Sequence, residues 1–221
     1  MSMPDKQFKI IPADENYLTG IVACHETAFP GEFLTLLGSR FLRSFYKYYC
    51  NHPDAIFLLA KDNKNGLIGG LVAGGAPYVR AHFMRKYIPM YLPVILYKSL
   101  MNSKVRKRLM EHSANAVSSL SKKIGIAKNR NQAPDNEYYD PSSSSLLSIC
   151  THSEYRGKGA AAALMEAFKE ESEKRGYHSM RLSVHNNNVA AIKLYKKMGW
   201  NIVMESHRGI YFKKDIKDNS V

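Results

Sequence analysis

Two glycines one residue apart stand between a short apolar run and a helical pattern. Gly157 and Gly159 lie in the run Arg156-Gly-Lys-Gly-Ala-Ala161, which follows the apolar segment 146–151 and precedes apolar residues at helical spacing. Such a turn exposes successive main-chain N–H groups at a helix N-terminus, where the helix dipole favours an anion. Glycine also lets the main chain approach a ligand closely. The run therefore predicts a strand, a phosphate-binding turn and a helix.

This turn has more than one interpretation. Read as Gly157-x-Gly159-x-x-Ala162, it fits the dinucleotide fingerprint. That fingerprint also needs an acid at the end of the next strand to hold a ribose, and the next strand ends in His185-Asn-Asn187. The phosphate-binding lysine motif of P-loop proteins is absent from the sequence. The dinucleotide interpretation is therefore weak, and a plain tight turn stays open.

The other apolar patterns indicate an α/β (α+β) chain. A chain of 221 residues that is 45% hydrophobic suits one domain with a substantial core. Alternating or continuous apolar runs predict strands near 8–11, 55–60, 67–73, 146–151, 180–184, 201–204 and 209–213. Helical spacing predicts helices near 14–25, 39–50, 161–175 and 188–198. This order predicts a mixed sheet of about seven strands flanked by helices, in a single domain over residues 1–221.

The positive charge of the chain is concentrated in one segment. Between Tyr78 and Arg130 stand twelve Lys or Arg residues and one acid, Glu111, so this segment carries +11 of the net charge of +13. We interpret residues 75–145 as a basic, partly helical insertion between the third and fourth strands. Within it we expect a helix near Lys104–Leu120 and a loop over Asn129–Ser145.

Other sequence features narrow the setting of the protein. The N-terminus lacks the apolar core of a secretory signal, and no run of about 18 apolar residues predicts a membrane span. Cys24, Cys50 and Cys150 form neither a disulfide framework nor a metal-binding spacing, so we expect them to be small core residues. These features favour a cytoplasmic protein without a metal.

Read as Arg156-x-x-Gly159-x-Ala161, the turn resembles the acetyl-CoA motif of the GNAT superfamily of N-acetyltransferases. The approach to the turn, Leu147-Ser-Ile-Cys-Thr-His-Ser-Glu-Tyr155, is similar to the family's strand at this place. A second block is similar as well, and reads Val184-x-x-x-Asn188-x-x-Ala191-x-x-Leu194-Tyr195-x-Lys197-x-Gly199-Trp200.

The resemblance implies a GNAT fold and an acyltransferase that uses acetyl-CoA. In this family the strand before the turn splays from its neighbour, and its main-chain groups bind pantetheine; here those groups belong to Ile149, Cys150 and Thr151. The resemblance assigns the pyrophosphate to Arg156, Gly157, Lys158, Gly159, Ala160 and Ala161. It assigns the pantetheine arm to Asn188 and places Tyr195 near the thioester sulfur. Asn188 is also a good helix N-cap, and Tyr195 also fits a core position.

The implied reaction is direct attack of a neutral amine on the thioester. A phenol with a pKa near 10 suits a proton donor at neutral pH, so Tyr195 is the candidate general acid. A main-chain N–H of the splayed strand would stabilise the developing oxyanion. Glu32, His152 and His185 are candidate bases, each with an ordinary structural alternative, and a relay of water molecules is an equal alternative.

The acceptor stays open at this level. A small-molecule amine such as an amino sugar is favoured, and a protein or peptide N-terminus and a non-catalytic, regulatory CoA-binding module are alternatives. The basic segment 78–130 is either a solvated surface, a lid, a site for an anionic acceptor, or a peripheral contact with an anionic membrane or lipid-linked substrate. Pro89 and Pro93 argue against one regular amphipathic helix there. Nucleic acid is not expected, and the protein is expected to be a monomer or homodimer.

Overall fold

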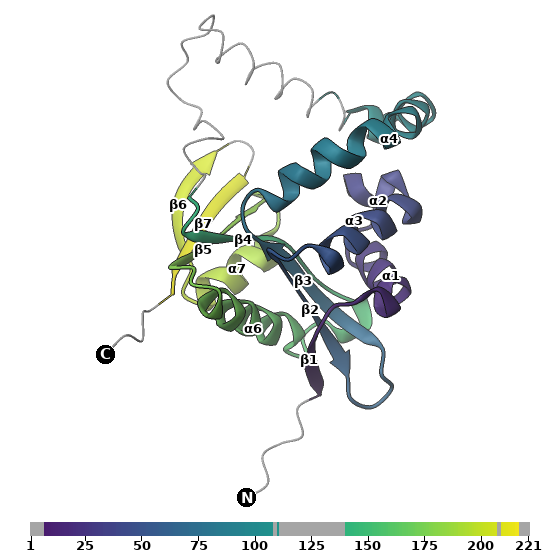
Figure 1. Cartoon of the computed structure of the whole chain (residues 1–221). Helices are drawn as coiled ribbons and strands as arrows, with labels where there is room; N and C mark the ends of the chain where they lie inside the picture. The colour runs from purple at the N-terminus through teal and green to yellow at the C-terminus, as the bar shows by residue number, and fades with distance from the viewer. Residues whose placement is uncertain (1–6, 108–109, 111–139, 207–208, 217–221) are drawn as a thin grey trace, which may run out of the picture.

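The computed structural model describes residues 7–107, 110, 140–206 and 209–216. Its centre is one sheet with helices on both faces (Figure 1). The strands are β1 (Phe8–Pro12), β2 (Ala55–Asp62), β3 (Ile68–Gly75), β4 (Ser143–Thr151), β5 (Ser179–Val184), β6 (Asn201–Ser206) and β7 (Gly209–Asp215). The helices are α1 (Leu18–Ala28), α2 (Phe33–Leu37), α3 (Ser39–Asn51), α4 (Val79–Met101), α6 (Ala160–Lys174) and α7 (Val189–Lys197).

The sheet is mixed, as the order of elements predicts. Its seven strands follow the order β1-β2-β3-β4-β5-β7-β6. Neighbouring strands are antiparallel except for β4 and β5, which are parallel because α6 connects them across one face. The predicted fold class, a mixed sheet of about seven strands flanked by helices, is confirmed. The partly helical insertion between the third and fourth strands is also confirmed, because α4 lies between β3 and β4 in the chain.

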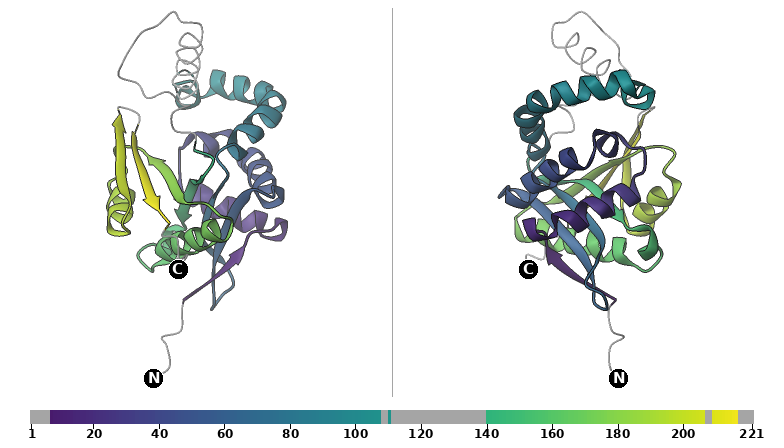
Figure 2. Two further views of the ribbon diagram at one scale, coloured as in Figure 1. Left: turned by 60° about the vertical axis from the view of Figure 1, so that its left-hand side comes forward. Right: turned by 90° about the vertical axis from the view of Figure 1, so that its right-hand side faces the viewer.

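The two faces of the sheet bury separate cores. Helices α1 to α4 cover one face, where large buried side chains such as Phe41 and Tyr46 pack against β2 and β3. Helices α6 and α7 cover the other face, where Leu164 and Phe168 pack with Trp200. Figure 2 shows these two layers on either side of the strands. The sheet is therefore buried on both faces in its centre, which holds β4 in place from two sides.

A glycine allows the closest of these contacts. A Cβ atom at Gly74 of β3 would clash with the main-chain oxygen of Ser145 on β4 and would lie 2.8 Å from Cζ of Phe168 on α6. Any other residue at this position would push β4 or α6 away from β3. Gly74 therefore fixes the spacing between these three elements.

The basic segment differs most from the predicted elements. Pro89 and Pro93 argue against one regular helix, yet α4 runs from Val79 to Met101 and contains both. Both prolines are exposed, and Figure 2 shows that α4 bends along its length. A proline removes one main-chain donor and crowds the preceding turn, so a helix that is anchored elsewhere can bend at proline instead of ending. The predicted helix near 104–120 and loop over 129–145 lie largely outside the described residues. The loop prediction is wrong at its end, because residues 143–145 belong to β4 and pair with β5.

Candidate active site

The main feature of the sheet is a gap between β4 and β5. These two strands pair only from Ser143 to Ser145, opposite Ser179 to Arg181. Further along, β4 pairs with β3 and β5 pairs with β7. In the described part of the chain, one edge of β4 beyond Ser145 therefore has no strand beside it. Main-chain N–H and C=O groups at such an edge are available to an extended ligand.

The pairing with β3 decides which groups face the gap. The His152 N–H donates to the Gly69 carbonyl of β3 at 2.9 Å. Successive residues of a strand direct their main-chain groups to alternate sides. The groups of Ile149 and Thr151 therefore face the gap, whereas those of Cys150 face its β3 partner, Leu71. Of the three strand residues predicted to bind pantetheine, two thus present their main chain to the gap.

Cys150 is a core residue. Its Sγ lies 3.9 Å from the Sγ of Cys24 on α1, and both side chains are buried. The neighbouring Cys24 thiol and burial raise the pKa of Cys150 well above its usual value, so the side chain stays a thiol. Both residues fit the prediction of small core cysteines, and the contact fixes α1 against β4.

The glycine turn follows β4 at the open end of the gap. Gly157 and Gly159 have φ angles of +76° and +86°, in the region that favours glycine. A Cβ atom at either position would meet nothing within 4 Å. Gly159 is the N-cap residue of α6, and no side chain caps this helix. The first N–H groups of a 15-residue helix therefore face open space, which suits a phosphate.

The neighbours of the two glycines differ in what they offer. Arg156 Nη2 donates to the Ala28 carbonyl at the end of α1 at 3.5 Å, and Lys158 Nζ lies 5.2 Å from the centre of the Tyr155 ring. Both basic side chains are exposed beside the turn. Ala160 is buried beneath it, so Ala160 can contribute only its main chain.

Two further predicted residues belong to α7. The Asn188 side chain accepts a hydrogen bond from the Ala191 N–H at 3.2 Å, so Asn188 is the N-cap of α7, as its sequence position indicates. Tyr195 is 5% exposed, and its ring lies 5.6 Å from that of Phe212 and 6.1 Å from that of Trp200. Burial raises the pKa of Tyr195 to about 12, so the phenol keeps its proton at neutral pH.

A pocket of about 260 Å³ lies where β4 and β5 separate. It is lined by side chains from both strands, from the end of α3 and from the start of α4. Leu146 and Leu182, which belong to the core under α6 and α7, line it together with Tyr49 and Arg80 from the other face. The pocket therefore reaches the gap from the face that α3 and α4 cover.

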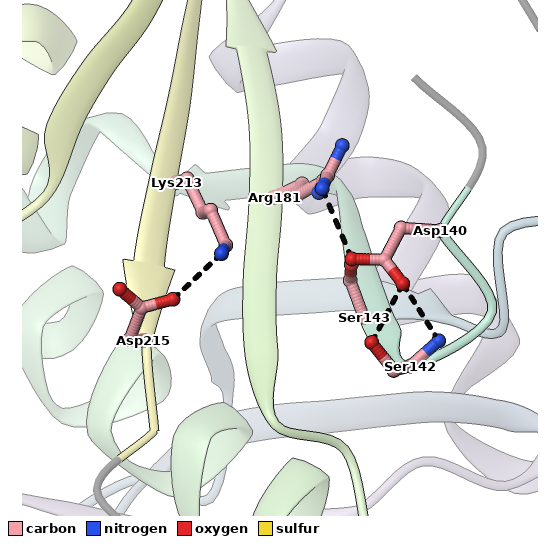
Figure 3. A network of polar contacts seen from close by, with 6 residues as sticks. All are labelled: Asp140, Ser142, Ser143, Arg181, Lys213 and Asp215. Atoms are coloured by element: carbon pink, nitrogen blue, oxygen red, sulfur yellow. Dashed lines mark hydrogen bonds and ion pairs between the residues drawn. The ribbon is translucent and has the colours of Figure 1, made fainter. Parts of the chain in front are cut away.

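A polar network holds one basic group of the pocket in place. Arg181 of β5 donates to Asp140 at 3.0 Å, and Asp140 also accepts hydrogen bonds from the hydroxyls of Ser142 and Ser143, each at 2.6 Å (Figure 3). The Ser142 hydroxyl, the Ser143 hydroxyl and then Arg181 lower the pKa of Asp140 to about 2. Asp140 is therefore ionised at neutral pH and neutralises much of the Arg181 charge.

Arg80 supplies a second positive charge at the pocket. It lies at the start of α4, close enough to Tyr49 to lower the pKa of that phenol, which burial raises. Among the described residues, no carboxylate forms an ion pair with Arg80. Asp140 thus balances the charge of Arg181, whereas no described carboxylate balances the charge of Arg80.

The three candidate bases lie elsewhere. Glu32 is the N-cap residue of α2, His152 accepts a hydrogen bond from the Glu154 N–H at the start of a 3-10 turn, and His185 is exposed at the end of β5. None of the three lines the pocket. Sequence reasoning missed Tyr49, Arg80, Arg181 and Tyr211 as pocket residues. One signal was available, because the alternation of strand 180–184 puts Arg181 on the face opposite buried Met180 and Leu182.

Two further features concern the described residues alone. In that part of the chain, no helix combines the length and the apolar character needed to cross a membrane. No group of three or more His, Cys, Asp or Glu side chains is placed there to hold a metal ion.

Solved structures share this fold. PaiA N-acetyltransferase from Thermoplasma acidophilum, in complex with coenzyme A, aligns over 94% of this chain and 98% of that chain, with a TM-score of 0.56 and 11% identity. The Escherichia coli ribosomal-protein-S18-alanine N-acetyltransferase aligns over 97% of this chain and 98% of that chain, with a TM-score of 0.53 and 14% identity. At these identities the likeness concerns the fold alone. The fold, with its splayed central strands, is that of the GNAT acetyltransferases.

The amino-acid sequence is also similar to that of known acetyltransferases. The model described as Acetyltransferase (GNAT) family matches residues 124–200. The Escherichia coli (strain K12) ribosomal protein bS18-alanine N-acetyltransferase is 39% identical over 56 residues, which are 25% of this chain and 38% of that protein. The uncharacterized N-acetyltransferase YobR of Bacillus subtilis (strain 168) is 36% identical over 62 residues, 28% of this chain and 25% of that protein. The matched parts thus span well under half of these curated relatives. Residues 124–200 of this chain thus match the GNAT acetyltransferase family, and the whole chain has the fold of these enzymes.

Proposed function

We propose that this protein is an acyltransferase that moves an acetyl group from acetyl-CoA to a primary amine of a small molecule, such as an amino sugar. The gap between β4 and β5, which opens toward the glycine turn of α6, carries the proposal. Coenzyme A has an extended pantetheine arm joined to a diphosphate. It would use both features at once, the strand edge for the arm and the helix N-terminus for the phosphates.

Each donor-side residue has a proposed role. Ile149 and Thr151, whose main-chain groups face the gap, bind the pantetheine arm. Cys150 lies between them and directs its main chain to β3. Asn188 also contacts the arm. The pyrophosphate is assigned to the turn, namely Arg156, Gly157, Lys158, Gly159, Ala160 and Ala161. We also propose a cytoplasmic setting, which the three free thiols support.

The bound donor supplies an activated carbonyl group. The protein's own groups then act on charge and protons. We assign to Tyr195, whose phenol keeps its proton, the donation of that proton to the departing sulfur. A main-chain N–H that faces the gap stabilises the negative charge that develops on the carbonyl oxygen. No residue is proposed as the base that makes the amine neutral.

The pocket favours an acceptor that carries a negative charge near its amine. Arg80 and Arg181 line the pocket, and only Arg181 is paired with a described carboxylate. A guanidinium binds a phosphate or carboxylate in a bidentate geometry, so Arg80 suits such a group on the acceptor. An amino sugar that bears a phosphate has both the amine and the anion.

A protein or peptide N-terminus is the second candidate acceptor. The relationship to a ribosomal protein bS18-alanine N-acetyltransferase favours it, although the match covers 38% of that protein. A third candidate is a module that binds CoA without catalysis. These three candidate functions predict different results in one assay. Acetyl transfer to a small molecule or to a peptide releases a thiol from acetyl-CoA, whereas a non-catalytic module releases none.

Thiol release from acetyl-CoA should be measured with phosphorylated amino sugars, neutral amino sugars and short peptides. The proposal expects the highest kcat/KM with a phosphorylated amino sugar, and a rise in KM of about tenfold in Arg80→Ala, equal to the loss of roughly 1.4 kcal/mol of charge-assisted binding. Arg85→Ala is the matched control, since Arg85 is exposed on α4 but does not line the pocket. Turnover with peptides alone would favour the second candidate, and CoA binding without turnover the third.

A further inference from the structure

The exposed apolar side chains of the protein are concentrated on α4 and just beyond it. Of eleven large hydrophobic side chains that are exposed in the described residues, eight lie between Met90 and Met110. Met90, Leu100 and Met101 are 70%, 74% and 72% exposed. Single exposed apolar side chains are ordinary, but a cluster of this size marks a contact surface. We call the eight residues the α4 apolar surface: Met90, Leu92, Val94, Leu96, Tyr97, Leu100, Met101 and Met110.

The opposite side of α4 is firmly packed. Phe83 stacks on Tyr87 with ring centres 4.7 Å apart and contacts Phe45 of α3 at 5.0 Å. The ring centres of Tyr91 and Phe41 lie 4.9 Å apart, and the hydroxyls of Tyr91 and Ser44 share a hydrogen bond of 2.6 Å. Lys98 donates to the Leu36 carbonyl of α2 at 3.0 Å. The α4 apolar surface is thus the outer side of an anchored helix, at the end of the molecule opposite β1 (Figure 1).

Charge indicates what this surface contacts. From Tyr78 to Lys107 the sequence has seven Lys or Arg residues and neither Asp nor Glu. Arg85 and Lys86 precede the α4 apolar surface, whereas Lys104, Arg106 and Lys107 lie within its C-terminal part, and all five are exposed. Exposed apolar side chains flanked by cations, with no acid before Glu111, match the interfacial region of a bilayer that contains anionic lipid.

We propose that the α4 apolar surface docks on the surface of an anionic phospholipid bilayer. The apolar side chains enter the boundary between headgroups and acyl chains, and the flanking Lys and Arg side chains contact the headgroup phosphates. Arg80, near the other end of α4, lines the pocket between β4 and β5. Docking would therefore attach to the bilayer the same helix that carries Arg80 of the pocket. The proposal stands independently of the proposed acetyl transfer.

Flotation with vesicles of phosphatidylcholine, with and without phosphatidylglycerol, tests the docking. The full-length protein should float with the anionic vesicles and much less with the neutral ones, and added salt should weaken the binding because the cations contribute. The double variant Leu96→Glu/Leu100→Glu places two negative charges one helical turn apart on this surface, and should reduce partitioning by at least about tenfold.

The matched control is Leu67→Glu/Val203→Glu, which adds the same charge at side chains that are 57% and 49% exposed and lie away from α4. It should float as the wild type does. Thermal unfolding and acetyl-CoA calorimetry of both double variants show whether folding and the donor site are intact. Absent flotation, equal flotation with neutral vesicles, or equal loss in the control would overturn the proposal. Dissociation of a dimer by the α4 variant alone, without vesicle binding by the wild type, would assign the surface to a second copy instead.

Discussion

The substitution Gly159→Glu tests the phosphate turn most directly. Gly159 has a φ of +86°, and a Cβ atom there would meet no atom within 4 Å. A glutamate therefore fits without a clash and costs only the strain of a left-handed backbone, roughly 1–2 kcal/mol. In a domain of this size that strain lowers the melting temperature by a few degrees, about 2–8 °C. The protein should remain folded at 25 °C.

The effect on acetyl-CoA binding should be specific to this position. A carboxylate at Gly159 would stand at the N-terminus of α6, where the pyrophosphate is proposed to bind. Two like charges about 5 Å apart at an effective dielectric constant of ~20 repel by roughly 3 kcal/mol. The glutamate side chain is flexible and can turn away, so about half of this repulsion should persist. The expected result is a dissociation constant raised at least tenfold, which is about 1.4 kcal/mol.

Gly176→Glu provides the matched control on the same helix. Gly176 follows the other end of α6, has a φ of +77° and also has open space at its Cβ position. It should therefore lose similar stability and keep its affinity for acetyl-CoA. Isothermal titration calorimetry with acetyl-CoA, together with thermal unfolding, separates the two effects. Unchanged affinity in Gly159→Glu, or an equal loss in Gly176→Glu, would refute the assignment of the turn.

Two further predictions concern buried groups. Tyr195→Phe removes only the phenol oxygen, so steady-state kinetics should show a fall in kcat of about 10²–10⁴-fold with little change in KM, and wild-type turnover would exclude Tyr195 as the acid. Burial lowers the pKa of His25 to about 4 from 6.5, so the unfolded chain binds the proton first as the pH falls. The free energy of unfolding should therefore decrease by up to about 3 kcal/mol between about pH 6.5 and 4. Urea titrations of His25→Gln should lack this part of the decrease, and identical pH profiles would contradict it.

The strand, turn and helix that hold the proposed donor side could be predicted from the sequence because they are built locally, and the roles assigned to their residues stay predictions. Gly157 and Gly159 signal positive φ angles, and the strand and helix around them follow from apolar spacing within residues 146–175. The structure places this turn at the open end of the gap between β4 and β5. The direction of the Cys150 main chain could not be predicted from the sequence. The hydrogen bond from His152 to Gly69 of β3 shows that this main chain faces away from the gap.

The basic segment and the pocket resisted prediction for a different reason. Proline statistics describe an isolated helix, whereas α4 continues through Pro89 and Pro93 because Phe83 and Tyr91 fasten it to α3 on both sides of Pro89. Such tertiary packing is not visible in local sequence. The short helix α2 was also missed, because its five residues are too few to show a helical period.

Besides β4, the pocket combines side chains from four elements that are distant in sequence. Tyr49 comes from α3, Arg80 from α4, Arg181 from β5 and Tyr211 from β7, so no spacing rule connects them. Only the contacts between elements bring them together. This division has a consequence for how the protein could change. The proposed donor side consists of main-chain groups and glycines, whereas the pocket is lined mainly by side chains. Since α4 carries both Arg80 and the α4 apolar surface, substitutions within this one helix are expected to alter the proposed acceptor site and the proposed bilayer contact together while the glycine turn stays intact.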